Sequence, residues 1–318
     1  MTDIDALNDE YGIPGQVTFT ESFGGLAFAE MTNVNGTAVV ALQGGHLINW
    51  TPRDQPPVIW LSKDAKFAPG KSIRGGIPVC WPWFGPHARE SSFPAHGFAR
   101  TNPWQVIAAG LTHGGGIRLV LNLEKNNAPS RQWPYSTELV MHITLGAALE
   151  IELVTRNIGA APITIGEALH TYFAVGDVRG IAIYGLEDCE YLDKVDHGRR
   201  KRQTGPVTFS GETDRVYLDT INDCLIDDPG LNRRIRITKR GSRSTVVWNP
   251  WHDKAAKMGD LGGDGYLKMV CVETANAADN VVSIEAGGEH HLKVIYRLES
   301  LPTGISEGQS ISVGDRSI

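Results

Sequence analysis

Apolar runs of strand length recur along most of this 318-residue chain, and glycine, asparagine or proline separates one run from the next. Such runs, bounded by turn formers, are typical of β-strands, and no helical stripe of comparable length competes with them. The pattern therefore predicts an all-β chain. The runs are 37–42, 47–50, 104–109, 117–123, 137–144, 149–155, 163–165, 168–173 and 181–184, with further stretches around Ile235, Val246, Leu267 and His291.

Two local patterns add detail to this prediction. Segments 138–143 and 148–156 are joined by a turn that contains Gly146, which predicts an antiparallel hairpin. Near the N-terminus, residues 5–11 predict one short helix, because the sequence Gly-Ile-Pro-Gly at 12–15 is a helix stop signal.

The composition fits one large domain. A hydrophobic content of 41% can bury a substantial core, and the 36 glycines and 17 prolines supply the turns that many short strands need. No internal repeat, low-complexity linker or composition break divides the chain. We therefore expect a single domain over residues 1–318, in which residues 1–30 form an N-terminal segment with the first edge elements.

The charge balance argues against nucleic acid or an anionic membrane as a partner. A net charge of −6 gives no overall attraction to a polyanion, so phosphate recognition must come from a few locally placed basic side chains. One basic run, 199–202, resembles a nucleic-acid patch. In an acidic chain without a nucleic-acid motif, a solvated loop is the better interpretation.

The chain also lacks the patterns of export and membrane insertion. Asp3 and Asp5 stand where a secretory signal has a basic region, and no run approaches the roughly 18 apolar residues of a membrane span. We expect a cytoplasmic protein, and a monomer because no amphipathic docking helix is evident. The cysteines are widely spaced, which favours reduced, structural thiols at Cys80, Cys189, Cys224 and Cys271.

Four segments set chemically versatile residues among glycine, proline and aromatic residues: 72–86, 93–100, 167–173 and 270–275. In the first, Arg74 precedes two glycines, and Trp81 and Trp83 follow. Aromatic rings beside an arginine suit a sugar with an anionic substituent, but the tryptophans could equally be buried loop anchors and Arg74 a surface charge. Arg100, at the end of the second segment, offers another planar fork of the kind that binds phosphate.

His170 and Glu273 are candidates for acid–base chemistry. Strand alternation places His170 on the same face as Ala168 and Tyr172, where a structural, hydrogen-bonded histidine is the simpler alternative. Glu273 follows the apolar run 269–272, and an unpaired carboxylate is costly to bury there. A structural salt bridge is the alternative role. A buried carboxylate with a raised pKa could act with a histidine as base and acid.

Metal binding has little support in the sequence. Among ten histidines, only His290 and His291 are adjacent, and neighbours on a strand face opposite ways. We expect no metal.

Eight segments, in this order, resemble the hexose-6-phosphate mutarotases, or glucose-6-phosphate 1-epimerases, of the galactose mutarotase-like superfamily. The resemblance spans nearly the whole chain. It implies a large antiparallel β-sandwich, the galactose mutarotase-like supersandwich, with the active site in a cleft on the concave face of one sheet. The segments are GGHLINWTP (44–52), SIRGGIPVCWPWFGP (72–86), HGFAR (96–100), EALHTYF (167–173), LDKVD (192–196), TDRVY (213–217), VWNPW (247–251) and VCVETANA (270–277).

The resemblance also implies a reaction and its residues. Glu273, as general base, would remove the proton of the C1 hydroxyl of a hexose 6-phosphate while His170, as general acid, protonates the ring oxygen. The open aldehyde would rotate about C1–C2 and close to the other anomer, without a cofactor. Glucose 6-phosphate is the expected substrate. The residues implied to bind its phosphate, ring and hydroxyls are Arg74, His96, Arg100 and Asp214.

Two other functions stay open at this point. An aldose 1-epimerase for unphosphorylated sugars would share the acid and base but would not need Arg74 and Arg100. A non-catalytic sugar-phosphate-binding protein would keep the cleft, although the presence of both His170 and Glu273 argues against it. A nucleic-acid-binding role rests on 199–202 alone.

Overall fold

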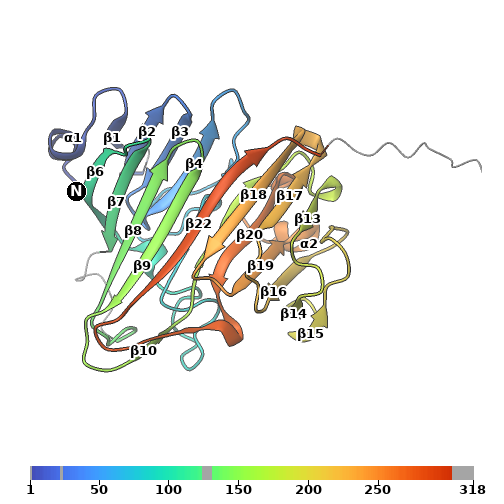
Figure 1. Ribbon diagram of the computed structural model, residues 1–318. Coiled ribbons are helices and arrows are strands. Elements are labelled where there is room, and N and C mark those ends of the chain that lie inside the picture. The colour runs from blue at the N-terminus through green and yellow to red at the C-terminus, as the bar shows by residue number, and fades with distance from the viewer. Residues whose placement is uncertain (1, 22–23, 124–130, 303–318) are drawn as a thin grey trace, which may run out of the picture.

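Antiparallel strands dominate the computed structural model, which describes residues 2–21, 24–123 and 131–302 (Figure 1). Two eight-stranded sheets form the body of the molecule. The first, called the β20 sheet, has the order β15 (Arg199–Arg202), β14 (Glu190–Asp193), β16 (Thr213–Tyr217), β19 (Ser244–Asn249), β20 (Met269–Asn276), β11 (Glu167–Leu169), β5 (Val79–Cys80), with β12 (Tyr172–Ala174) also paired to β20. The all-β prediction is confirmed.

The second eight-stranded sheet, called the β22 sheet, lies in front of the first in Figure 1. Its order is β13 (Ala182–Tyr184), β17 (Cys224–Asp228), β18 (Arg233–Arg240), β22 (Glu289–Glu299), β9 (Leu149–Asn157), β8 (Thr137–Leu145), β7 (Ile117–Leu123), β6 (Trp104–Leu111). Strands β8 and β9 form the hairpin that the sequence predicts.

Smaller elements complete the described part of the chain. A four-stranded sheet runs β1 (Val17–Glu21), β2 (Ala27–Asn33), β3 (Gly36–Ala41), β4 (His46–Pro52), and a two-stranded sheet pairs β10 (Ile163–Ile165) with β21 (Val282–Ile284). Two α-helices are described, α1 (Ile4–Tyr11) and α2 (Trp251–Ala255). The predicted N-terminal helix is thus confirmed, and Asp3 caps it by accepting a hydrogen bond from the Ala6 amide at 3.1 Å. Within the described ranges, no helix has the length and apolar character needed to cross a bilayer.

The two large sheets share one apolar core, as a sandwich requires. Val272 of β20, Leu153 of β9 and Leu292 of β22 all belong to this buried cluster. β20 is buried along its whole length, because one face packs on the core and the other is covered by polar and aromatic side chains. This explains why the first half of its sequence, 269–272, is a continuous apolar run and does not alternate. The predicted β-sandwich is confirmed.

Two predicted elements differ from the observed ones. The run 168–173 is not one strand: β11 ends at Leu169 and β12 begins at Tyr172, because the amide of His170 turns aside to donate to the Pro78 carbonyl at 3.0 Å. The basic run is also wrong as a loop. It forms the edge strand β15, whose side chains pair with acidic neighbours, among them Lys201 with Asp193 at 2.8 Å.

A buried polar cluster ties the two large sheets together. The Oε1 atom of Glu167 in β11 accepts a hydrogen bond from Asn276 of β20 at 3.0 Å and lies 2.9 Å from Nε2 of His290 in β22. Glu167 is fully buried. Because Glu167 and Asn276 stand directly opposite each other, the cluster also fixes the register between β11 and β20.

We predict that Glu167→Ala lowers the free energy of unfolding by about 2–3 kcal/mol, because it leaves Asn276 and His290 without their buried partner. The matched control is Glu150→Ala, which removes a partly exposed partner of Lys293 on the same sandwich and should cost under about 1 kcal/mol. Chemical denaturation of the three proteins measures both values. Equal losses in the two variants would contradict the prediction.

Candidate active site

His170 and Glu273 meet on the face of the β20 sheet that points away from the apolar core. The last paired residues of β11 and β20 are Leu169 and Thr274, so the next position in the antiparallel register places His170 opposite Glu273. Nε2 of His170 lies 3.3 Å from Oε1 of Glu273. The side chain of Glu273 is 1% exposed and that of His170 is 12% exposed. The imidazole is thus the member of the pair that reaches the surface.

Burial controls the protonation of both groups. It raises the pKa of Glu273 well above the usual carboxyl range; Asp214 adds to this rise, and Arg100 opposes it. Burial also lowers the pKa of His170 well below its usual value, with further lowering from the neighbouring His96 and Arg100. Both shifts favour uncharged forms. Oε2 of Glu273 is buried and has no hydrogen-bond partner among the described residues.

An aromatic stack fixes the imidazole. The ring of Tyr172 lies parallel to that of His170, with centroids 5.0 Å apart and an interplanar angle of 14°. Trp60 also stacks on Tyr172, with ring centroids 5.9 Å apart, and Trp248 meets His170 edge-on at 6.1 Å. The prediction that His170 and Tyr172 share a face is confirmed.

Arg74 joins this stack from the segment before β5. Its Nη1 donates to the hydroxyl of Tyr172 at 3.1 Å, and its Nε donates to Asp260 at 3.1 Å. Its side chain is 26% exposed, so Arg74 is a half-buried, oriented cation and not a surface charge. Electrostatic attraction to Tyr172 and Asp260 raises its pKa further, despite the burial, and it stays charged.

The two glycines after Arg74 allow a close approach to His46. Nε2 of His46 donates to the Gly75 carbonyl at 2.8 Å, and burial lowers the pKa of this histidine to about 4. Gly76 has a φ of +69°, and a Cβ atom there would lie 2.4 Å from Nε2 of His46. A side chain at this position would therefore push the Arg74 segment away from the site.

His96 and Arg100 approach from the next loop. Nδ1 of His96 accepts a hydrogen bond from the Gly85 amide at 3.3 Å, which leaves the ring proton on Nε2. Burial, with the charges of Arg100 and Arg74, lowers the pKa of His96 to about 3, so it is a neutral donor. The rings of His96 and His170 are 5.8 Å apart. Nη2 of Arg100 donates to the Ala95 carbonyl at 2.9 Å.

Asp214 approaches from the opposite side of Glu273. It lies on β16, where its backbone partner on β19 is Trp248, and its carboxylate is 4.0 Å from the ammonium of Lys254. Burial raises the pKa of Asp214. The sequence-predicted residues therefore come together on one face of the β20 sheet, and their mutual electrostatic effects reflect this: His96, Arg100 and Arg74 act on His170, and Asp214 and Arg100 act on Glu273.

The two tryptophans of the 72–86 segment are loop anchors. Trp81 is 1% exposed and donates to Thr155 of β9 at 3.1 Å, inside the core. Trp83 packs on Phe93 and donates to the Pro94 carbonyl at 3.0 Å. The interpretation of these rings as loop anchors is therefore correct. Aromatic contact near the pair comes instead from Trp60, Tyr172 and Trp248, of which Trp60 carried no sequence signal because it stands outside every motif.

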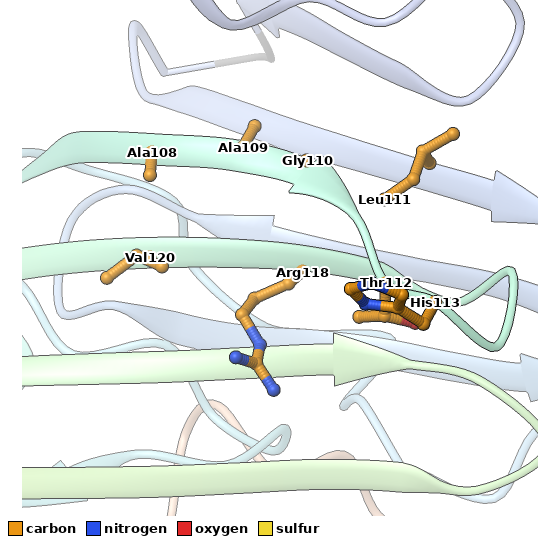
Figure 2. Close-up of a pocket in the computed structure, with 8 residues that line it drawn as sticks. All are labelled: Ala108, Ala109, Gly110, Leu111, Thr112, His113, Arg118 and Val120. Atoms are coloured by element: carbon orange, nitrogen blue, oxygen red, sulfur yellow. The ribbon is translucent and has the colours of Figure 1, made fainter.

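A separate hollow lies on the β22 sheet. It is lined by β6 and β7 and the turn between them, including Ala108, His113 and Arg118 (Figure 2). None of the predicted site residues lines it. β6 is the edge strand of its sheet, whereas the His170–Glu273 pair lies in the other sheet. We assign no chemistry to this hollow.

Cysteine 271 completes a group of potential metal ligands beside the pair. One ligand atom from each of His170, Cys271 and Glu273 lies within 4.8 Å of the others. All four cysteines are free thiols, in agreement with the sequence-based expectation. The three residues come from two separate segments, 167–173 and 270–275, and neither segment contains adjacent histidines.

Comparison with known proteins gives a consistent result. A family model described as aldose 1-epimerase matches residues 28–297. A protein of Escherichia coli K12 named "Putative glucose-6-phosphate 1-epimerase" is 41% identical over 243 residues, which are 76% of this chain and 80% of that protein. A protein of Cenchrus ciliaris with the same name is 33% identical and covers 86% of this chain and 84% of its own.

A solved structure supports the same relationship. The crystal structure titled as a putative mutarotase from Salmonella typhimurium superposes with a TM-score of 0.84 at 33% identity, over 92% of this chain and 96% of that one. The chain therefore shares the architecture described above with the Salmonella typhimurium protein, along nearly the whole length of both.

We predict that Glu273→Gln stabilises the fold, by about 1–3 kcal/mol at pH 8. The folded-state pKa of Glu273 is raised, so the folded protein loses stability as the pH rises through that pKa, whereas glutamine stays neutral. The gain should therefore be larger at about pH 8 than at about pH 5. Chemical denaturation at the two pH values measures it. The exposed control Glu285→Gln should stay within about 0.5 kcal/mol; a gain that shrinks as the pH rises would contradict the prediction.

Proposed function

Because this chain belongs to the aldose 1-epimerase family, we propose that it interconverts the α and β anomers of a hexose 6-phosphate, with D-glucose 6-phosphate as the substrate. The observation that carries the proposal is the contact of 3.3 Å between His170 and Glu273, in a site that also contains Arg74 and Arg100. The names of the relatives in Escherichia coli and Cenchrus ciliaris support the same substrate.

The pair can open a sugar ring by moving two protons. With the shared proton on His170, the carboxylate of Glu273 takes the proton of the C1 hydroxyl while the imidazolium gives its proton to the ring oxygen O5. The C1–O5 bond breaks, and C1 becomes an aldehyde. Glu273 then carries the proton and His170 is neutral. These are the uncharged forms that burial favours, so the surroundings of the pair stabilise the open-chain stage.

Ring closure reverses the same steps on the other face of the carbonyl. After rotation about C1–C2, His170 takes back the O5 proton while Glu273 returns a proton to the carbonyl oxygen. The atoms and charges balance without an external acid, base or cofactor. Because the pair returns to its starting protonation state after each cycle, the protein speeds the equilibrium between the anomers and does not shift it.

The arginines supply the feature that distinguishes a phosphorylated sugar. The hydrogen bonds of Arg74 to Asp260 and Tyr172 use two of its three guanidinium nitrogens and hold the group in one orientation. Arg100 is held through the Ala95 carbonyl. A phosphate held by these two cations would anchor C6 while C1 rotates, and such remote binding energy can be used to orient the reacting atoms. In this proposal, His96 and Asp214 would bind ring hydroxyls.

Cytoplasmic location, a monomeric state and the absence of a nucleic-acid partner remain predictions from the sequence. The ion pairs of the run 199–202 support the prediction that the protein binds no nucleic acid. Arg200 pairs with Asp279, and Lys201 pairs with Asp193 and Asp196. Such pairing leaves less positive charge for a polyanion.

We predict that the wild-type protein accelerates anomer exchange of glucose 6-phosphate in NMR exchange spectroscopy, and that Glu273→Gln and His170→Asn each lower the rate by about 10²–10⁴-fold. Both variants should still bind the sugar phosphate. Free galactose is the comparison substrate. Acceleration of galactose alone would favour an aldose 1-epimerase for unphosphorylated sugars, and binding without any acceleration would favour a non-catalytic binding protein.

We predict that Arg100→Ala and Arg74→Ala each raise the KM for glucose 6-phosphate by about 10–100-fold, since each removes a charge-assisted hydrogen bond. Exchange of free glucose by the same variants should change little. Arg199→Ala, on the exposed strand β15, is the control and should leave both values unchanged. Unaltered KM in both site variants would remove the phosphate assignment while leaving the acid–base pair in place.

A further inference from the structure

We propose that the site binds Zn²⁺ through His170, Cys271 and Glu273, and that the bound ion inhibits the protein by occupying its acid and base. Zinc binding does not depend on the proposed function; only the inhibition rests on it. Bound Zn²⁺ would thus regulate the proposed activity at the active site itself.

The geometry of the three side chains suits one small ion. Cys271 and Glu273 are two positions apart on β20 and so point to the same face, and His170 stands opposite them at the break between β11 and β12. Their ligand atoms lie within 4.8 Å of one another, and the His170–Glu273 pair is at 3.3 Å. Ligands around a tetrahedral Zn²⁺ are about 3.3–3.8 Å apart. Small side-chain rotations therefore complete the site.

The chemistry of the ligands selects the ion. An imidazole, a thiolate and a carboxylate form a nitrogen, sulfur and oxygen set that favours Zn²⁺, whereas Mg²⁺ and Ca²⁺ prefer oxygen ligands alone. Three protein ligands leave a fourth position for water, as in open zinc sites. In addition, Oε2 of the buried Glu273 has no partner among the described residues, and a cation beside this carboxylate would satisfy it.

Binding requires two protons to leave. One leaves the Cys271 thiol as the Zn–S bond forms, and the other leaves the His170–Glu273 pair as its imidazole nitrogen and carboxylate oxygen bind the ion. Both protons pass to solvent, and no group is oxidised or reduced. With zinc bound, Glu273 cannot take the proton of the C1 hydroxyl and His170 cannot give one to O5. Inhibition should therefore be competitive with the sugar phosphate and reversed by a chelator.

The test uses Co²⁺ as a coloured substitute for Zn²⁺ on the full chain, because thiolate ligation gives a cobalt charge-transfer band in the near ultraviolet. We expect the band in wild-type protein and its loss in Cys271→Ser. The matched control is Cys80→Ser, which alters another fully buried thiol, on β5 of the same sheet, and should keep the band. Competition with a chromophoric chelator should show at least about a tenfold loss of Zn²⁺ affinity in Cys271→Ser and none in the control.

The outcomes separate the possibilities. A wild-type protein without the band, or a Cys271→Ser variant that binds Zn²⁺ as tightly as wild type, would overturn the proposal; the second result would point to exposed groups such as His291 with Glu152 and Glu289. Thermal unfolding of Cys271→Ser shows whether this variant is folded. Cys271→Ala, which also removes the thiol, should lose the band as well and serves as a second variant if the serine variant is misfolded. Excess Mg²⁺ should not displace Co²⁺. If the band forms but no sugar is turned over, the zinc site stands and the proposed function fails.

Discussion

The buried contact between Glu273 and His170 is the interaction on which the rest of the site depends. A carboxyl group taken out of water is costly to ionise, and its direct partner here is an imidazole whose own charged form is disfavoured by the same burial. Neither group therefore holds the other in its charged form. A carboxylate paired with an arginine at this position would stay ionised and would make a poor proton carrier, whereas this pair can hold its proton on either side.

Such a pair needs rigid support, and the sandwich provides it from both strands. Glu273 stands on a strand that lies inside its sheet and is buried on both faces. His170 stands where β11 breaks before β12, and its ring is held by stacking on Tyr172. The cluster of Glu167, Asn276 and His290 fixes the register of the same two strands from the core side. The positions of His170 and Glu273 are therefore fixed by interactions within the protein, before any substrate binds.

Much of this could be predicted from the chain itself, and the remainder could not for physical reasons. Apolar runs and turn residues identify strands well, because alternation and burial determine which residues stand at neighbouring positions of the sequence. The break at His170 has no such local pattern, since it depends on a hydrogen bond to Pro78, ninety-two positions earlier. The edge strand at 199–202 reads as a loop because its charges are neutralised by residues from other segments, such as Asp279. Trp60 and Asp260 enter the site only through tertiary packing.

The arrangement around Tyr172 joins recognition to chemistry. One face of its ring stacks on His170, while its hydroxyl accepts a hydrogen bond from Arg74. Under the proposed function, the cation that holds the C6 phosphate and the imidazole that protonates O5 are therefore positioned by the same side chain. A phosphate pulling on Arg74 would act through Tyr172 on the orientation of His170. Binding at the unreactive end of the sugar would thus stabilise the productive geometry at the reacting end, which is how remote binding energy contributes to a rate.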